Sequence, residues 1–219
     1  DLILDPDLIL DPEKNLRSQG RFFKFDSWRF FSPQIYKRMA NLKDSPHFQV
    51  YDDYYTPKSA WERIEPSIPK SGSVRYKTRV WEACMLGADL SQSPKYLTDL
   101  GCEVIADTTM DCLEKQPEDW DIIITNIPFD IKKKVPILKK FLEYDKPFIV
   151  IMNSMNTFTK YFHSIFKGKV KDLQIITPSG KIHFDKLEGG VLTPTKNCSF
   201  YCVYVCYKVN LPPEQLWID

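Results

Sequence analysis

The sequence of 219 residues has little excess charge and no long apolar run. Thirty Lys and Arg residues are set against 29 Asp and Glu, which leaves a net charge of +1. The whole chain is therefore not a polycation, and any affinity for nucleic acid has to come from a local patch. No apolar stretch has the length of a membrane span and no signal peptide is visible, so we expect an intracellular protein, cytoplasmic or nuclear.

Glycine is scarce, with 8 residues, and the glycine-rich patterns that bind phosphates are missing. Neither G-x-G-x-x-G nor a P-loop occurs, so a dinucleotide or a nucleoside triphosphate would lack its usual cradle. The six cysteines include no C-x-x-C pair and the three histidines are dispersed, which excludes the spacing of a zinc site. We expect reduced thiols and no metal site.

From residue 51 onward the sequence alternates between predicted strands and helices. The strands are expected at 79–85, 102–107, 120–126, 147–153 and 173–178, and the helices at 57–66, 93–101, 132–144 and 159–166. A β segment at 181–185 and a long final strand at 199–209 follow, and the final strand is expected to insert antiparallel. This order predicts a Rossmann-like α/β fold with a doubly wound, mostly parallel sheet, whose ligand site lies at the carboxyl ends of its strands.

The first 50 residues differ in character and are predicted to form an N-terminal appendage to a domain at 51–219. They begin with the hexapeptide DLILDP twice and continue rich in charged and aromatic residues, with a short helix predicted near 33–42. Interleaved basic and aromatic side chains fit packing against the domain, and contact with a nucleic acid or a protein partner is the alternative.

Polar side chains stand at the carboxyl ends of the predicted strands. Glu82 belongs to the first, Asp107 ends the second with Asp111 in the loop after it, and Asn126 ends the third. A carboxylate can accept two hydrogen bonds from a diol, so the acids suit a ligand with ribose hydroxyls and an amino group. A nucleoside cofactor without phosphate fits, and S-adenosylmethionine is the candidate. A solvated acid is the alternative for Glu82, and a helix N-cap for Asp107 and Asp111, which compete for one role.

The segment Asn126-Ile127-Pro128-Phe129, directly after an apolar strand, suits a planar amine. The exocyclic N6 amine of adenine is a poor nucleophile because its lone pair is delocalised into the ring. Asn126 offers a side-chain carbonyl, and the backbone carbonyl before Pro128 offers a second acceptor, which proline holds in place. Phe129 offers a ring on which a flipped-out base can stack. A turn that merely closes the strand is the alternative.

Four segments together resemble the S-adenosylmethionine-dependent N6-adenine methyltransferases. NIPF is similar to their Asn/Asp-Pro-Pro-Tyr/Phe signature and to the Asn-Ile/Leu-Pro-Tyr/Phe form of the ribosomal RNA adenine dimethyltransferases. YYTP at 54–57 resembles the Tyr/Phe-Thr-Pro segment of the DNA adenine methyltransferases. The order YYTP, VWEAC, EVIAD, TNIPF matches the family over about residues 50–155. The resemblance implies methyl transfer to the N6 amine of adenine in nucleic acid, with DNA ahead of RNA.

The resemblance also implies site residues. Those at cofactor positions are Tyr55, Thr56, Glu82, Gly87 and Asp107, and those of the amine pocket are Asn126, Ile127, Pro128 and Phe129. The loop EACMLGADLSQS departs from the family, because Met85 and Leu86 stand where a glycine-rich turn is usual. An inactive methyltransferase-like subunit that binds nucleic acid or a protein partner is therefore the alternative, and a small-molecule or protein methyltransferase is a third.

The basic run Lys132-Lys133-Lys134 directly follows the expected amine pocket. Such runs are usually a solvated helix face, but the position next to the pocket favours contact with phosphates. We predict these three lysines as nucleic-acid-binding residues.

Overall fold

The computed structural model describes residues 54–70, 76–188, 191–195 and 198–219. All of these residues lie in the unit that spans residues 50–219. The predicted appendage at 1–50, with its helix near 33–42, lies outside the described residues. Among the helices of the described part, none combines the length and the apolar character needed to cross a membrane.

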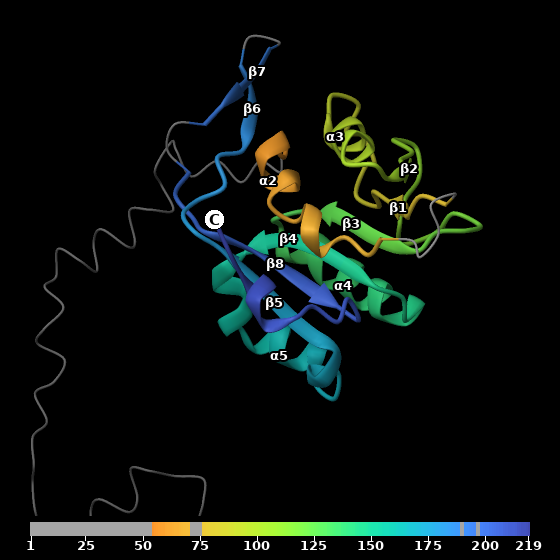
Figure 1. Ribbon diagram of the computed structural model, residues 1–219, viewed down its shortest axis with the longest axis vertical. Coiled ribbons are helices and arrows are strands. Elements are labelled where there is room, and N and C mark those ends of the chain that lie inside the picture. Colours follow the sequence, from red (N-terminus) through yellow and green to blue (C-terminus); the bar gives the residue numbers. More distant parts are fainter. Residues whose placement is uncertain (1–53, 71–75, 189–190, 196–197) are drawn as a thin grey trace, which may run out of the picture. The chain divides into compact units, whose positions relative to one another are not determined.

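A seven-stranded sheet with the order β2-β1-β3-β4-β8-β5-β9 forms the centre of this unit (Figure 1). Its strands are β1 (Arg79–Trp81), β2 (Glu103–Ile105), β3 (Ile122–Asn126), β4 (Phe148–Asn153), β5 (Leu173–Pro178), β8 (Cys202–Tyr207) and β9 (Trp217–Ile218). The first four strands pair in parallel, and β8 runs antiparallel between β4 and β5. The predicted α/β fold, mostly parallel with an inserted antiparallel strand, is confirmed.

Helices cover both faces of the sheet (Figure 1). The α-helices are α2 (Lys58–Glu62), α3 (Ser93–Asp99), α4 (Ile131–Tyr144) and α5 (Lys160–Phe166), and the 3-10 helices are η3 (Glu65–Ser67), η4 (Ser154–Phe158), η5 (Val170–Asp172) and η6 (Pro213–Leu216). Ile122 and Ile124 are buried with residues of α2 and α3, whereas Ile123 is buried with residues of α4 and α5. Successive side chains of a strand point to opposite faces, so a strand that is covered on both sides is apolar throughout.

Side-chain caps and a glycine fix the ends of several helices. The Lys132 N–H donates to Asp130 Oδ1 at 2.9 Å and so begins α4. Thr159 Oγ1 accepts from the Phe162 N–H at the start of α5. After α3 the chain turns at Gly101, whose φ of +92° lies in the left-handed region where glycine is favoured. These local signals explain why α3, α4 and α5 lie where helices are predicted.

Several predicted segments differ from the structure. The strands expected at 79–85 and 102–107 end at Trp81 and Ile105. The helix expected at 57–66 is divided into α2 and η3, because Pro66 has no N–H to donate to the carbonyl of Glu62. The β segment expected at 181–185 is not regular; a hairpin follows instead, made of β6 (Asp185–Glu188) and β7 (Val191–Pro194). The strand expected to finish the chain is β8, and the short β9 follows it and pairs parallel with β5.

Candidate active site

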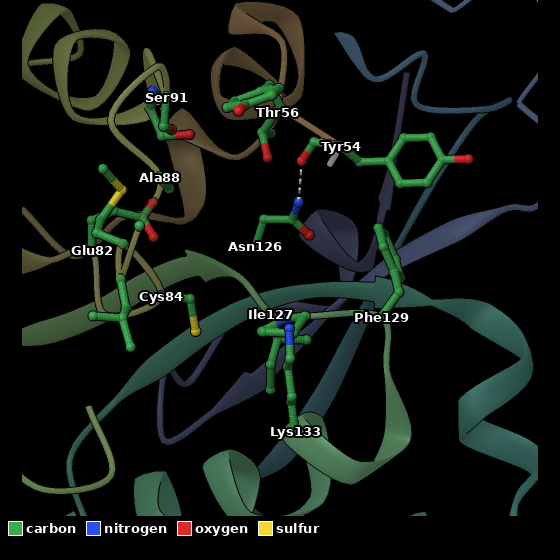
Figure 2. Close-up of a pocket in the computed structure, with 16 residues that line it drawn as sticks. Tyr54, Thr56, Glu82, Cys84, Ala88, Ser91, Asn126, Ile127, Phe129 and Lys133 are labelled. Carbon is green, nitrogen blue, oxygen red and sulfur yellow. Dashed lines mark hydrogen bonds between the residues drawn. The ribbon is translucent and has the colours of Figure 1, made fainter. Parts of the chain in front are cut away.

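A cavity of about 260 Å³ lies at the carboxyl ends of β1 and β3 (Figure 2). Three segments line it: residues 54–56 before α2, part of the loop at 82–93 after β1, and residues 126–129 after β3, joined by Lys133 of α4. The volume is slightly below the roughly 300–1,000 Å³ of pockets that enclose whole small ligands. The cavity therefore suits one part of a ligand, with the rest lying in its open mouth.

The structure brings together eight of the nine residues that the sequence assigns to the cofactor and to the amine. Those that line the cavity are Tyr55, Thr56, Glu82, Gly87, Asn126, Ile127, Pro128 and Phe129. They come from segments that lie up to about 70 positions apart in the sequence, and the parallel sheet places them at one edge.

Asp107 does not line this cavity. Its strand, β2, ends at Ile105, and Asp107 lies in the loop beyond, where Oδ1 accepts from the hydroxyl of Thr109 at 2.7 Å and from its N–H at 2.8 Å. These two hydrogen bonds lower the pKa of Asp107. Asp111 behaves in a similar way, because its Oδ1 accepts from the Leu113 N–H at 2.9 Å. Both carboxylates close turns in their own loop.

Glu82 is a buried acid with one paired and one unpaired oxygen. The hydroxyl of Thr125 donates to Glu82 Oε1, whereas Oε2 is buried and has no hydrogen-bond partner among the described residues. Burial raises the pKa of Glu82 to about 8, because removal from water disfavours the charged form. The unpaired oxygen can accept a hydrogen bond from a ligand in the cavity, and a positively charged ligand would favour the ionised form.

Asn126 presents a second unpaired acceptor. Its Nδ2 donates to the carbonyl of Tyr54 at 3.4 Å (Figure 2), and its Oδ1 is buried without a partner in the described part of the chain. Of the three buried side-chain atoms that lack a partner there, two belong to residues that line this cavity. Buried polar atoms are nearly always hydrogen-bonded in native proteins. Two unpaired acceptors in one cavity therefore indicate a site whose donors come from a ligand.

Phe129 packs in an aromatic cluster that holds its ring in place. The ring centroids of Tyr54 and Phe184 lie 5.7 Å from that of Phe129, and the centroid of Phe200 lies 5.1 Å away. The Tyr54 and Phe184 rings are nearly perpendicular to it, an arrangement that aromatic pairs favour. The ring remains half-buried at the wall of the cavity.

The loop after β1 turns tightly with a single glycine. The Ala88 N–H donates to the carbonyl of Met85 at 2.8 Å, and Gly87 stands at the third position of this turn with a φ of +71°, which favours glycine. Leu86 is 57% exposed and Met85 is buried in the wall. Met85 and Leu86 thus line the cavity without filling it.

The three lysines of the predicted basic run point in different directions, because helical residues turn by about 100° each. Lys132 and Lys133 are exposed, and Lys133 lines the cavity. Lys134 is 2% exposed, and its Nζ donates to Asn156 Oδ1 at 3.2 Å and lies 5.9 Å from the centroid of the Phe129 ring. Lys134 therefore supports the wall of the cavity and is not accessible to a phosphate in solvent, which corrects the prediction for this residue.

Sequence reasoning did not identify Thr125, Tyr54 or Cys84 as site residues. Thr125 is a polar residue that directly follows three isoleucines in β3, a signal that could have found it. Tyr54 belongs to the YYTP segment, and it contributes both its backbone carbonyl, which accepts from Asn126, and its ring, which packs against Phe129. Cys84 lines the cavity, and its contact with the Cys112 thiol, together with burial, raises its pKa, so it is a neutral thiol rather than a nucleophile. No metal-binding group of three or more His, Cys, Asp or Glu occurs among the described residues.

No family model matches the sequence, and no curated protein matches it. Among solved structures, a Listeria monocytogenes protein assigned to the class I S-adenosylmethionine-dependent methyltransferases has a TM-score of 0.50 and 16% identity, with 95% of this chain and 79% of that chain covered. An S-adenosylmethionine-dependent O-methyltransferase from Thermotoga maritima has a TM-score of 0.34 and 15% identity, with 88% of this chain and 69% of that chain covered. The first similarity shows the Rossmann-like methyltransferase fold.

Proposed function

We propose that the protein is an S-adenosylmethionine-dependent methyltransferase that acts on the N6 amine of adenine in nucleic acid, with DNA ahead of RNA. The observation that carries the proposal is the pair of unpaired buried acceptors, Glu82 Oε2 and Asn126 Oδ1, in one cavity at the carboxyl edge of this fold. A carboxylate suits a cationic or amino group, and an amide oxygen suits a neutral amine. The two acceptors thus match a charged cofactor and an aromatic amine.

The cofactor would be held by Tyr55, Thr56, Glu82 and Gly87, which line the cavity together. Glu82 offers an acceptor in a buried wall, and the turn at Gly87 lets the backbone approach without a bulky side chain. When bound, S-adenosylmethionine supplies a methyl group on a positively charged sulfur. Asp107 lies outside the cavity lining, so we leave it out of this set.

The target amine would be held by Asn126 and by the carbonyl of Ile127. Two acceptors that take the two N–H groups draw the nitrogen lone pair out of conjugation with the ring, which makes the amine a better nucleophile. Phe129, fixed by its aromatic neighbours, would stack the base, an interaction worth roughly 1–3 kcal/mol. No general base is required, because the proton leaves after the nitrogen–carbon bond has formed.

A methyltransferase-like subunit without activity is the second candidate. The position of Asp107 outside the cavity favours it, and so does the small volume of about 260 Å³. The two candidates make different predictions for cofactor binding and for turnover, so one experiment separates them.

The test combines calorimetry with methyl transfer from labelled S-adenosylmethionine to single-stranded DNA, duplex DNA and RNA. We expect Asn126→Ala to bind the cofactor as the wild type does but to transfer methyl groups about a hundredfold more slowly, since it lacks one polarising group. If the wild type binds no S-adenosylmethionine, the result favours the second candidate, a methyltransferase-like subunit without activity. If Asn126→Ala is fully active, the amine is not held by this residue.

A further inference from the structure

The net charge of +1 conceals a division of charge along the domain. Residues 80–130, from β1 to the N-cap of α4, contain eleven Asp and Glu against two Lys, whereas residues 131–186, from α4 to the start of β6, contain twelve Lys against four Asp and Glu. In the sheet, β2, β1 and β3 lie on one side of β4, and β8 and β5 lie on the other. A polyanion would be repelled by the first part and attracted by the second.

An exposed apolar patch lies at the carboxyl edge of the sheet, beside the basic part. It consists of Met155 and Phe158 of η4 and Tyr201 before β8, which are 66%, 78% and 57% exposed. The Ser154 N–H donates to the carbonyl of Tyr201 at 2.9 Å, which brings the two segments together. Exposed apolar side chains on neighbouring segments offer a surface on which an apolar or aromatic group of a ligand can pack.

The apolar patch is close to the cavity. Phe200, the neighbour of Tyr201 in the sequence, contacts Phe129 with a centroid distance of 5.1 Å, and Phe129 lines the cavity. A chain-like ligand that crosses the apolar patch can therefore place one of its units at the cavity while its neighbours stay on the surface.

Lysines lie along this route. Lys181 Nζ is 5.1 Å from the ring centroid of Tyr201 and also donates to the carbonyl of Cys198 at 2.8 Å. Lys186 Nζ is 4.7 Å from the ring centroid of Tyr54, which lines the cavity. Lys160 is exposed at the start of α5, directly after η4. Tyr201 is exposed and Tyr54 is half-buried. Cations beside accessible aromatic rings are a combination that binds unpaired nucleotides, since every base has a face that can stack.

We propose that this edge binds a single-stranded nucleic acid, with bases on Tyr201 and Phe158 and phosphates near Lys160, Lys181 and Lys186. The inference rests on the proposed function for the base that enters the cavity, and it adds the strandedness of the substrate. A duplex hides the faces of its bases, so stacking on these rings requires unpaired bases. Because the flanking cations carry one sign of charge, a polyanion fits this surface better than a neutral protein partner.

Binding of short labelled oligonucleotides, followed by fluorescence anisotropy without cofactor, tests the aromatic part. We expect the wild type to prefer single strands to duplex, and the double variant Tyr201→Ala/Phe158→Ala to bind single strands at least about twentyfold more weakly, about fivefold for each ring. Tyr76→Ala is the matched control, since Tyr76 is 73% exposed before β1, at the opposite edge of the sheet. Equal binding by the double variant, a preference for duplex, or binding of polyglutamate instead of oligonucleotides would each overturn the proposal.

The salt dependence of binding tests the lysines. Each phosphate contact contributes about 0.7 to the slope of log K against log salt for a single strand, so we expect Lys160→Gln and Lys186→Gln each to lower the slope by about that amount. Lys171→Gln, in η5 before β5 and thus at the opposite edge, should leave the slope unchanged. Unchanged slopes in the Lys160→Gln and Lys186→Gln variants would contradict the route.

The results also separate this proposal from the proposed function. If the wild type binds no cofactor but the surface variants change binding as expected, the proposed methyl transfer is rejected and the nucleic-acid surface is supported. If turnover depends on Asn126 but all surface variants bind oligonucleotides as the wild type does, only the proposed binding surface is rejected.

Discussion

Thr125 determines which oxygen of Glu82 meets the cavity. Its hydroxyl donates to Glu82 Oε1 and accepts from the Cys84 N–H at 3.2 Å, so one side chain joins the ends of β1 and β3. With Oε1 engaged, Oε2 is left as the unpaired acceptor. Such a residue touches neither of the proposed ligands and acts by positioning a residue that does.

We predict that Thr125→Val destabilises the protein by about 1–3 kcal/mol, because it removes the hydroxyl that bonds to both the buried Glu82 Oε1 and the Cys84 N–H. The loss of this hydrogen bond should also raise the pKa of Glu82 further and weaken binding of S-adenosylmethionine. Urea unfolding and calorimetry measure the two effects. Thr125→Ser keeps the hydroxyl and is the matched control; if it loses as much affinity as Thr125→Val, the hydroxyl is not what positions Glu82.

At this scale the sequence predicted the residues whose chemistry is local. Asn126, Pro128 and Phe129 lie within four consecutive residues, and the apolar run before them is visible in the sequence. The partners that set their geometry are distant: the carbonyl that orients Asn126 belongs to Tyr54, 72 positions earlier. Asp107 was placed at a strand end, but β2 stops two residues before it, and the length of a short strand is not encoded in its own residues.

At the scale of elements, α4 connects the amine pocket to the cavity wall. The N-cap of the helix, Asp130, directly follows Phe129, and the first turn carries Lys133 to the cavity and Lys134 to the face of the Phe129 ring. A shift in the start of this helix would therefore move both groups. The cap is the contact that holds the start in place.

We predict that Asp130→Ala lowers the free energy of unfolding by about 1 kcal/mol, the usual loss for an N-cap. The affinity for single-stranded oligonucleotides should also fall, because the first turn that presents Lys133 would fray. Urea unfolding and anisotropy measure these losses. Asp130→Asn keeps an oxygen that can cap and should retain most of the stability, and equal losses in both variants would argue against the cap.

The hairpin of β6 and β7 shows which elements sequence patterns miss. Its strands, DKLE and VLTP, lack strong alternation, and they pair with each other rather than with the main sheet. It is tied to the domain by the backbone bridge between Tyr55 and Asp185, with N–H to carbonyl distances of 2.9 and 2.8 Å. Strands with weak patterns and one non-local anchor leave little trace in the sequence, whereas β3 and β4, buried on both faces, are visible as apolar runs.

For the whole molecule, a buried acid in the wall of the site makes stability depend on pH. In the folded protein the pKa of Glu82 is raised to about 8, so its carboxyl group stays protonated until the pH approaches that value. The ordinary pKa of a glutamate, expected in the unfolded chain, is 4.5. Between these values the unfolded chain binds fewer protons than the folded one, so the free energy of unfolding falls as pH rises. Below pH 4.5 and above pH 8 this contribution is constant.

We therefore predict that the wild type loses stability relative to Glu82→Gln between about pH 4.5 and 8, by an amount on the order of a few kcal/mol. Urea unfolding of both proteins across this range isolates Glu82, because all other groups are shared and cancel in the difference. A cationic ligand should oppose the loss, since its charge favours the ionised carboxylate; the stabilisation of the wild type by S-adenosylmethionine should thus increase with pH, and that of Glu82→Gln should not. Parallel stability curves for the two proteins would show that Glu82 has an ordinary pKa, and the cavity would then lack the buried acid on which cofactor binding is proposed to depend.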